Sequence, residues 1–220
     1  MFISRMALNG ARRQSAFLLS SPHAMHAAVL ASFPPGSAHG GEEGRVLWRV
    51  DREPSNAIWL YVVSPQRPDM THLVEQAGWP TTSAWECRDY LPFLSRVTTG
   101  QHWAFRLTAN PVRTVTAETG ASKRLAHVTA AQQVDWLLER VDQHGFIVTD
   151  GGADTPNVLI SRREKKSFRR GEGTVTLATA QFDGVLEVTD AGLLRRAMQR
   201  GIGRGKGYGC GLLTLVPSAS

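Results

Sequence analysis

Two histidines near the start of the chain, His23 and His26, are the residues whose type and spacing best suit proton-transfer chemistry. An unperturbed imidazole titrates near about pH 6.5, so at neutral pH one histidine can accept a proton while another donates one. Cleavage of RNA uses both roles, because a base deprotonates the 2′-hydroxyl and an acid protonates the leaving 5′-oxygen. The pair therefore suggests a phosphodiester transesterification that needs no metal, with two ordinary surface histidines as the alternative.

The sequence around these histidines predicts a helix that holds both of them on one side. Ser21 and Pro22 suit the cap and the first helical position, and Pro34 limits the far end, so we expect a helix over 21–32. Residues three apart share a helix face, and the N-terminal end of a helix favours an approaching anion. A metal site is not predicted, because no carboxylate or third ligand accompanies the pair.

A dense block of positive charge is the second feature with chemical consequences. The chain has a net charge of +6, and six cations interrupted by one acid, Glu164, fall within nine residues. This block predicts a polyanionic partner, with nucleic acid favoured and a solvated charged loop as the alternative. Strand patterns on both sides predict an extended hairpin. The candidate RNA-binding residues on it are Arg162, Arg163, Lys165, Lys166, Arg169 and Arg170.

Glycine occupies every second position from residue 201 to residue 211, and Arg204 and Lys206 lie between the glycines as candidate phosphate contacts. A nucleotide-binding loop follows a strand and opens a helix, whereas here a helix pattern precedes and an apolar run follows. The Arg-x-x-Gly-x-Gly spacing from Arg200 also matches acyl-CoA-binding acetyltransferases, with the same inverted order. A flexible turn is a further alternative. The candidate glycine-rich loop residues are Gly201, Gly203, Gly205, Gly207, Gly209 and Gly211.

Hydrophobic periodicity predicts two successive sets of strands and helices. In the first set we expect strands over 1–9, 45–50, 57–63 and 101–110, and helices over 21–32 and 70–77. In the second set we expect a helix capped by Thr129, strands over 146–149, 158–161 and 174–180, a turn at 182–184, a helix over 190–200 and a last strand over 212–216. The order strand, helix, strand, strand, helix, strand is ferredoxin-like. We therefore predict an α+β fold with two tandem ferredoxin-like (RRM-like) domains, 1–110 and 111–220.

The cysteines and the apolar runs favour a cytoplasmic, reduced protein. Cys87 and Cys210 have neither the number nor the spacing of a disulfide scaffold or a zinc site. No apolar run approaches the length that spans a bilayer, and the run at 17–19 is too short for a signal peptide. No membrane partner is expected.

Several segments together resemble a known family. They are Leu8-Asn9, the helix with His26, the run 105–111, Trp136-Leu137, the run 182–186 and the glycine-rich stretch with the Leu-Leu that follows it. On these segments the chain resembles the CasE-type endoribonucleases of type I-E CRISPR systems, nearly end to end. The resemblance implies two ferredoxin-like domains and cleavage of a repeat RNA at the base of its stem-loop, with neither metal nor cofactor. It also implies 5′-hydroxyl and 2′,3′-cyclic phosphate ends, and retention of the RNA in Cascade with other protein subunits.

The resemblance also assigns roles to individual residues. The family's catalytic histidine corresponds to His26, and the tyrosine that the family often has three residues earlier is His23 here. The basic hairpin corresponds to the family's stem-contacting hairpin. A non-catalytic RNA-binding subunit, with the same basic surface and no turnover, remains the alternative function.

Overall fold

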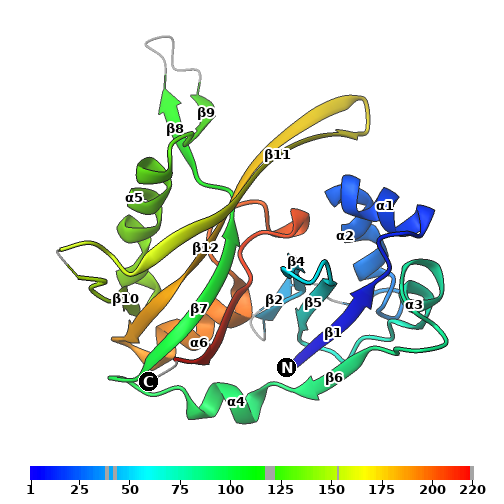
Figure 1. Cartoon of the computed structure of the whole chain (residues 1–220), viewed down its shortest axis with the longest axis horizontal. Helices are drawn as coiled ribbons and strands as arrows, with labels where there is room; N and C mark the ends of the chain where they lie inside the picture. The colour runs from blue at the N-terminus through cyan, green and yellow to red at the C-terminus, as the bar shows by residue number, and fades with distance from the viewer. Residues whose placement is uncertain (38–39, 42–43, 117–121, 153, 219–220) are drawn as a thin grey trace.

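Two antiparallel sheets, each covered by its own helices, lie next to each other in the computed structural model (Figure 1). The structure describes residues 1–37, 40–41, 44–116, 122–152 and 154–218. The first sheet and its helices use the chain up to residue 89, and the second sheet begins at residue 102. The helix α4 (Leu91–Arg96) connects them.

The first unit has the strand order β4-β5-β1-β6, with every neighbouring pair antiparallel. Together with its helices, this order is the ferredoxin-like arrangement that we predicted for the first half of the chain. The strands of this sheet are β1 (Phe2–Leu8), β4 (Leu47–Arg52), β5 (Ile58–Ser64) and β6 (Glu86–Asp89). The helices are α1 (Arg13–Ser20), α2 (Pro22–Leu30) and α3 (Thr71–Ala77), and a small ribbon pairs β2 (Gly40–Gly41) with β3 (Gly44–Arg45).

The helix α2 begins where the sequence predicts. The side chain of Ser21 accepts a hydrogen bond from the backbone N–H of Ala24 at 3.3 Å, and Pro22 occupies the first turn. Met25 and Val29 are buried against the first sheet, which leaves the intervening residues toward the rest of the molecule. The helix α1, directly before it, was not predicted.

The second unit has the strand order β10-β12-β7-β13, which is again ferredoxin-like. The strands of this sheet are β7 (His102–Ala109), β10 (Phe146–Val148), β12 (Gly173–Val188) and β13 (Leu213–Pro217), and β11 (Val158–Arg170) pairs with β12 as the long predicted hairpin. The helices are α5 (Ala130–Val141) and α6 (Ala191–Arg200), with one-turn 3-10 helices η1 (Asp142–His144) and η2 (Lys206–Tyr208). A separate ribbon pairs β8 (Val112–Thr116) with β9 (Ser122–Ala126).

Two strand predictions were wrong. The strand expected to complete the first sheet, 101–110, is β7, which pairs with β12 and β13 in the second sheet. The first sheet is instead completed by β6, a short, polar edge strand without the apolar alternation that marks a strand. We infer that the boundary between the two domains lies between β6 and β7, before the predicted position at residue 110.

The predicted turn at 182–184 is also wrong, because β12 runs straight through it. Phe182 is fully buried in the second core, and Asp183 accepts a hydrogen bond of 2.5 Å from Nε of Arg106 on the neighbouring strand. Gly184 is required by packing, since a Cβ there would lie 3.0 Å from the Cα of Val158. Phe-Asp-Gly therefore reads as a turn in the sequence only because the close approach of the paired strand is not visible there.

The strand β4 joins the two units, because its two faces contact different neighbours. Trp48 packs in the core under α1 and α2, whereas Leu47 belongs to the core of the second unit. Arg49, which is 3% exposed, forms a two-bond ion pair with Asp51 at 2.7 and 2.9 Å. Its remaining donors reach the second sheet at 2.9 Å each, to the carbonyls of Arg106 and Leu212 and to the hydroxyl of Thr214.

Candidate active site at the junction of the two units

His26 lies where α2 of the first unit meets the glycine-rich loop of the second. The ring is half-buried, and its Nδ1 accepts a hydrogen bond of 3.3 Å from the indole Nε1 of the buried Trp48. An indole nitrogen can only donate, so Nδ1 must carry the lone pair and the neutral ring has its proton on Nε2. The Nε2 edge of the ring faces Gly207, where a Cβ would come within 3.2 Å of that nitrogen.

Alternate glycines of the loop allow close contact with the first unit. Gly207 lies against His26, and Gly209, in the left-handed region at φ +80, lies flat on the ring of Trp48. A side chain at Gly209 would meet that indole at 2.6 Å as well as being strained. The glycines therefore bring backbone next to the histidine and its indole partner.

Other glycines of the same row allow contact with the second unit. A Cβ at Gly203 would lie 3.0 Å from Trp136, and one at Gly205 would lie 3.5 Å from Asn110. The loop follows α6 and precedes β13. Because acetyltransferase and nucleotide loops need the opposite order, both of those alternatives are wrong.

Lys206 and Arg204 alternate with these glycines. Lys206 is half-buried, and burial, followed by the charges of Arg45 and Arg200, lowers the pKa of its ammonium group. Arg204 is exposed and forms no ion pair with any other described residue. The loop thus carries a partly desolvated cation close to the residue that contacts His26, and a solvated cation farther along.

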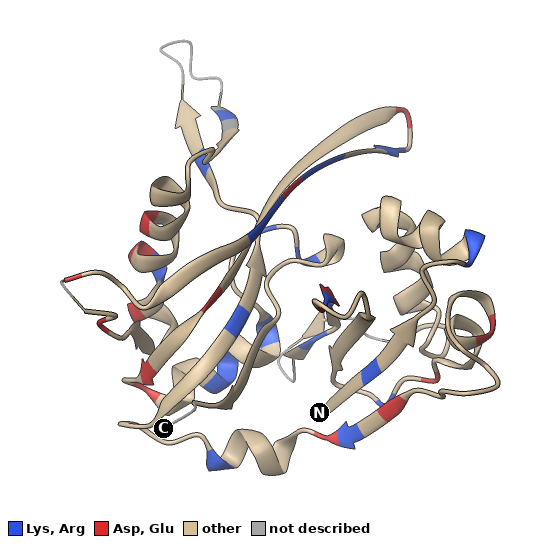
Figure 2. Ribbon diagram, viewed as in Figure 1, with Lys and Arg blue, Asp and Glu red and all other residues tan. Residues whose placement is uncertain are grey.

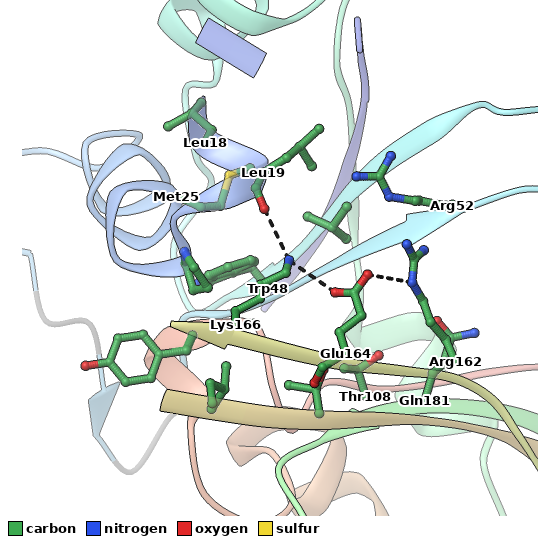
Figure 3. A pocket seen from close by; sticks show the side chains of 16 residues that line it. Leu18, Leu19, Met25, Trp48, Arg52, Thr108, Arg162, Glu164, Lys166 and Gln181 are labelled. Atoms are coloured by element: carbon green, nitrogen blue, oxygen red, sulfur yellow. Dashed lines mark hydrogen bonds and ion pairs between the residues drawn. The ribbon is translucent and has the colours of Figure 1, made fainter. Parts of the chain in front are cut away.

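One face of the basic hairpin is turned toward the first unit and is partly neutralised. Figure 3 shows Glu164 between two cations, 2.7 Å from Nε of Arg162 and 3.2 Å from Nζ of Lys166. Burial alone would raise the pKa of the Glu164 carboxyl, but the charges of Lys166 and Arg162 outweigh it and hold that pKa below its ordinary value. Lys166 also donates to the carbonyl of Leu19 at the end of α1, at 3.1 Å.

The opposite face of the hairpin is the freely charged one. Strand alternation places Arg163, Lys165 and Arg169 on the side away from Glu164, and all three are exposed. Figure 2 shows the blue of these cations along the arm of the hairpin. Arg170 is exposed at the tip, before the turn into β12. The six candidate RNA-binding residues of the hairpin therefore fall into two groups of different character.

The base of the hairpin is fixed to the glycine-rich loop by a small apolar cluster. Phe168 and Leu177 of the hairpin pack with Cys210, and the rings of Phe168 and Tyr208 meet edge to face at 5.0 Å. Burial raises the pKa of the Cys210 thiol to about 12, so this cysteine is a packing residue and not a nucleophile. The hairpin and the loop beside His26 are thus one structural block.

Comparison with known proteins assigns the chain to a family. The family model described as CRISPR associated protein matches residues 1–217. The chain belongs to this family of CRISPR associated proteins. The CRISPR-associated endoribonuclease Cse3 of Thermus thermophilus is 31% identical over 99% of this chain and 100% of its own length. The CRISPR system Cascade subunit CasE of Escherichia coli is 32% identical over 51% of this chain and 57% of its length.

A solved structure of the same group has the same fold. The structure of CRISPR endoribonuclease Cse3 bound to a 19 nt RNA superimposes with a TM-score of 0.82 at 29% identity, covering 99% of this chain and 100% of that one. The two ferredoxin-like units of the present chain are therefore those of the CRISPR associated family, as the sequence resemblance implied.

Within this member of the CRISPR associated family, the predicted site residues come together only in part. Lys206 and Gly207 lie at His26, and Lys166 reaches the end of α1, directly before the helix that carries His26. His23 is exposed near the first turn of α2, whereas His26 is half-buried. Arg169 and Arg170 lie toward the tip of the hairpin and not at the histidine.

Sequence reasoning missed Trp48, the hydrogen-bond partner of His26. The sequence offers only one signal for it, a tryptophan in a predicted strand, because the two residues are 22 positions apart. In the part of the chain that the structure describes, no helix is long and apolar enough to cross a membrane. Among the same residues, no three His, Cys, Asp or Glu side chains cluster as a metal site would require.

Proposed function

We propose that this chain is the endoribonuclease that cleaves CRISPR repeat RNA at the base of its stem-loop. The 2′-hydroxyl next to the cleaved bond attacks its own phosphate, which leaves a 2′,3′-cyclic phosphate and a 5′-hydroxyl. The product stays bound, and the chain takes its place in Cascade with the other protein subunits. The observation that carries the proposal is the position of His26, held between Trp48 and Gly207 at the foot of a cationic hairpin.

The proposed roles follow from this geometry. His26 is the principal proton-transfer and hydrogen-bonding residue and acts through Nε2, the nitrogen that faces the loop surface. Lys206 stabilises the charge that develops on the phosphorane, because a partly desolvated cation interacts with an anion more strongly than a solvated one. His23, exposed in the first turn of α2, is the candidate for the second proton transfer.

The RNA stem is bound by the hairpin and the loop. The exposed cations Arg163, Lys165 and Arg169 contact phosphates directly, and Arg204 extends the same surface. Arg162 and Lys166 set the angle of the hairpin through Glu164 and the end of α1, and they contact RNA second. Arg170 reaches the stem farthest from the cleaved bond. We place this activity in the cytoplasm, which agrees with the two free cysteines, Cys87 and Cys210.

A pair of RNAs distinguishes this proposal from a subunit that binds RNA without cleaving it. The all-ribose stem-loop is cut in excess EDTA, whereas the same RNA with a 2′-deoxy group at the junction binds and stays intact. His26→Ala binds both RNAs with parental affinity and cuts neither. Cleavage by His26→Ala at the parental rate contradicts the role of His26, and no cleavage by the parent protein supports the non-catalytic alternative.

A further inference from the structure

A second polar cavity lies on the side of the glycine-rich loop that faces α5. The cavity has a volume of about 310 Å³, and Asn110, Trp136, Arg140, His144 and Arg204 are among the residues that line it. Gly203 borders it against Trp136, whereas Gly207, farther along the loop, contacts His26. Four residues of extended chain span at most about 14 Å, so the cavity is within reach of RNA that leaves the His26 site.

The charge of this cavity is one-sided. Arg140 and Arg204 line it, and no Asp or Glu is among the described residues that do so. Burial, and then the charges of Lys206 and Arg140, lowers the pKa of His144, so its imidazole is neutral at pH 7 and can both donate and accept hydrogen bonds. The one acid paired with Arg140 is Glu139, which is 70% exposed and lies outside the cavity. A cavity of this kind attracts an anion.

Two further features suit a nucleobase. The guanidinium of Arg140 lies 4.6 Å from the ring centroid of Trp136, fixed by a hydrogen bond of 2.6 Å to the carbonyl of the same residue. A planar cation held in this way is a surface on which bases stack. The amide oxygen of Asn110 is buried and has no hydrogen-bond partner among the described residues, so it lacks a donor that an exocyclic amino group of a base could supply.

We propose that this cavity binds one unpaired ribonucleotide that flanks the stem, with its phosphate at Arg204, its base on Arg140 and its polar edge at Asn110. This inference rests on the proposed function, because it assigns part of the same RNA to a second site. It makes Asn110, Arg140 and His144 specificity residues, since the amide of Asn110 favours bases that carry an amino group. The stem is held by the hairpin, and the flanking nucleotide is held separately, on the other side of the loop.

Binding of uncleavable RNA tests the proposal. The parent and Arg140→Gln are titrated, by fluorescence anisotropy at one fixed salt concentration, with 2′-deoxy-blocked stem-loops that have or lack unpaired flanking nucleotides. We expect Arg140→Gln to weaken binding of the flanked RNA about tenfold and of the bare stem less than twofold. Arg196→Gln, which removes an exposed arginine of α6 outside the cavity, leaves both affinities unchanged. Equal losses on the two RNAs overturn the proposal.

Two additions close the remaining routes. A flank of abasic nucleotides separates phosphate from base, and if it binds the parent as tightly as the natural flank, no base occupies the cavity. Gln143→Ala changes an exposed residue at the rim, so its selective loss on the flanked RNA is expected even if Arg140→Gln unfolds. Because every reading is a binding constant on RNA that cannot be cut, failure of the cleavage proposal appears separately, as intact all-ribose RNA.

Discussion

The indole Nε1 of Trp48 lies 3.3 Å from Nδ1 of His26, and this contact decides which nitrogen of the histidine is available. A base acting at Nε2 needs its proton on Nδ1, which the indole N–H opposes. The resting site therefore presents Nε2–H as a donor toward bound RNA. For Nε2 to accept a proton, the hydrogen bond to Trp48 must first be lost.

Trp48→Phe is expected to slow cleavage about tenfold while RNA affinity stays within about twofold. The phenyl ring preserves most of the packing but removes the donor, and one net hydrogen bond corresponds to about one factor of ten in rate. The pattern of ring ¹H–¹⁵N couplings of His26 measures the tautomer directly, and we expect it to change from Nε2–H toward a mixture. Trp79→Phe, at an exposed tryptophan, is the matched control. An unchanged tautomer in Trp48→Phe would mean that the indole does not set it.

Gly207→Ala tests the closeness of the loop to the histidine. The backbone of Gly207 is not in the left-handed region, so alanine fits there without strain, but its methyl group reaches 3.2 Å from Nε2 of His26. We expect cleavage to fall at least tenfold, with a melting temperature within about 3 °C of the parent. Gly41→Ala, where a Cβ meets nothing within 4 Å, leaves both quantities unchanged. Parental cleavage by Gly207→Ala would show that RNA does not use this side of the ring.

Opposite effects are expected from neighbouring residues of the hairpin. Lys165→Gln removes an exposed cation, so binding weakens and the salt slope of the affinity falls by about 0.7 to 0.9. Glu164→Gln removes the charge that neutralises Arg162 and Lys166, so binding strengthens at low salt. Affinities from 50 to 300 mM salt measure both effects. The same direction of change in both variants contradicts the division of the hairpin into two faces.

His144 is expected to make the free protein less stable at acid pH. Because its pKa is lowered in the folded state, the unfolded chain binds more protons below about pH 6.5, and stability falls as the pH decreases through that region. His144→Gln lacks this term, so the melting temperature of the variant falls less between pH 7.5 and pH 5.5 than that of the parent. Parallel curves for the two proteins would mean that His144 titrates equally in both states.

Much of the fold was predictable because its signals are local. Thr129 and Gln132 form a complete capping box at the start of α5, and the carboxylate of Asp190 accepts from the backbone of Leu193 at the start of α6. The arms of the hairpin alternate with the strand period from residue 158 to residue 180. Each of these features involves residues that are close in sequence.

The parts that could not be predicted depend on residues that are far apart in sequence. The apolar pattern of β7 is the same whichever sheet the strand joins, so only its pairing with β12 and β13 assigns it. The spacing of His23 and His26 correctly indicated a shared helix, but their different exposure depends on the loop that covers His26. The contact of Trp48 with His26 depends on how β4 packs under α2, which no local pattern encodes.

Arg49 gives the molecule a timetable. It bonds to the carbonyl of Leu212, a residue 163 positions later, and the loop that covers His26 ends just before that point. At a synthesis rate of about 5 to 20 residues per second, the helix with His26 leaves the ribosome on the order of ten seconds before its partners exist. A nascent chain therefore holds the histidine without the surface that surrounds it, and a product truncated before β13 has no complete site. Whatever the site does to RNA begins only after both sheets have been synthesised and Arg49 has joined them.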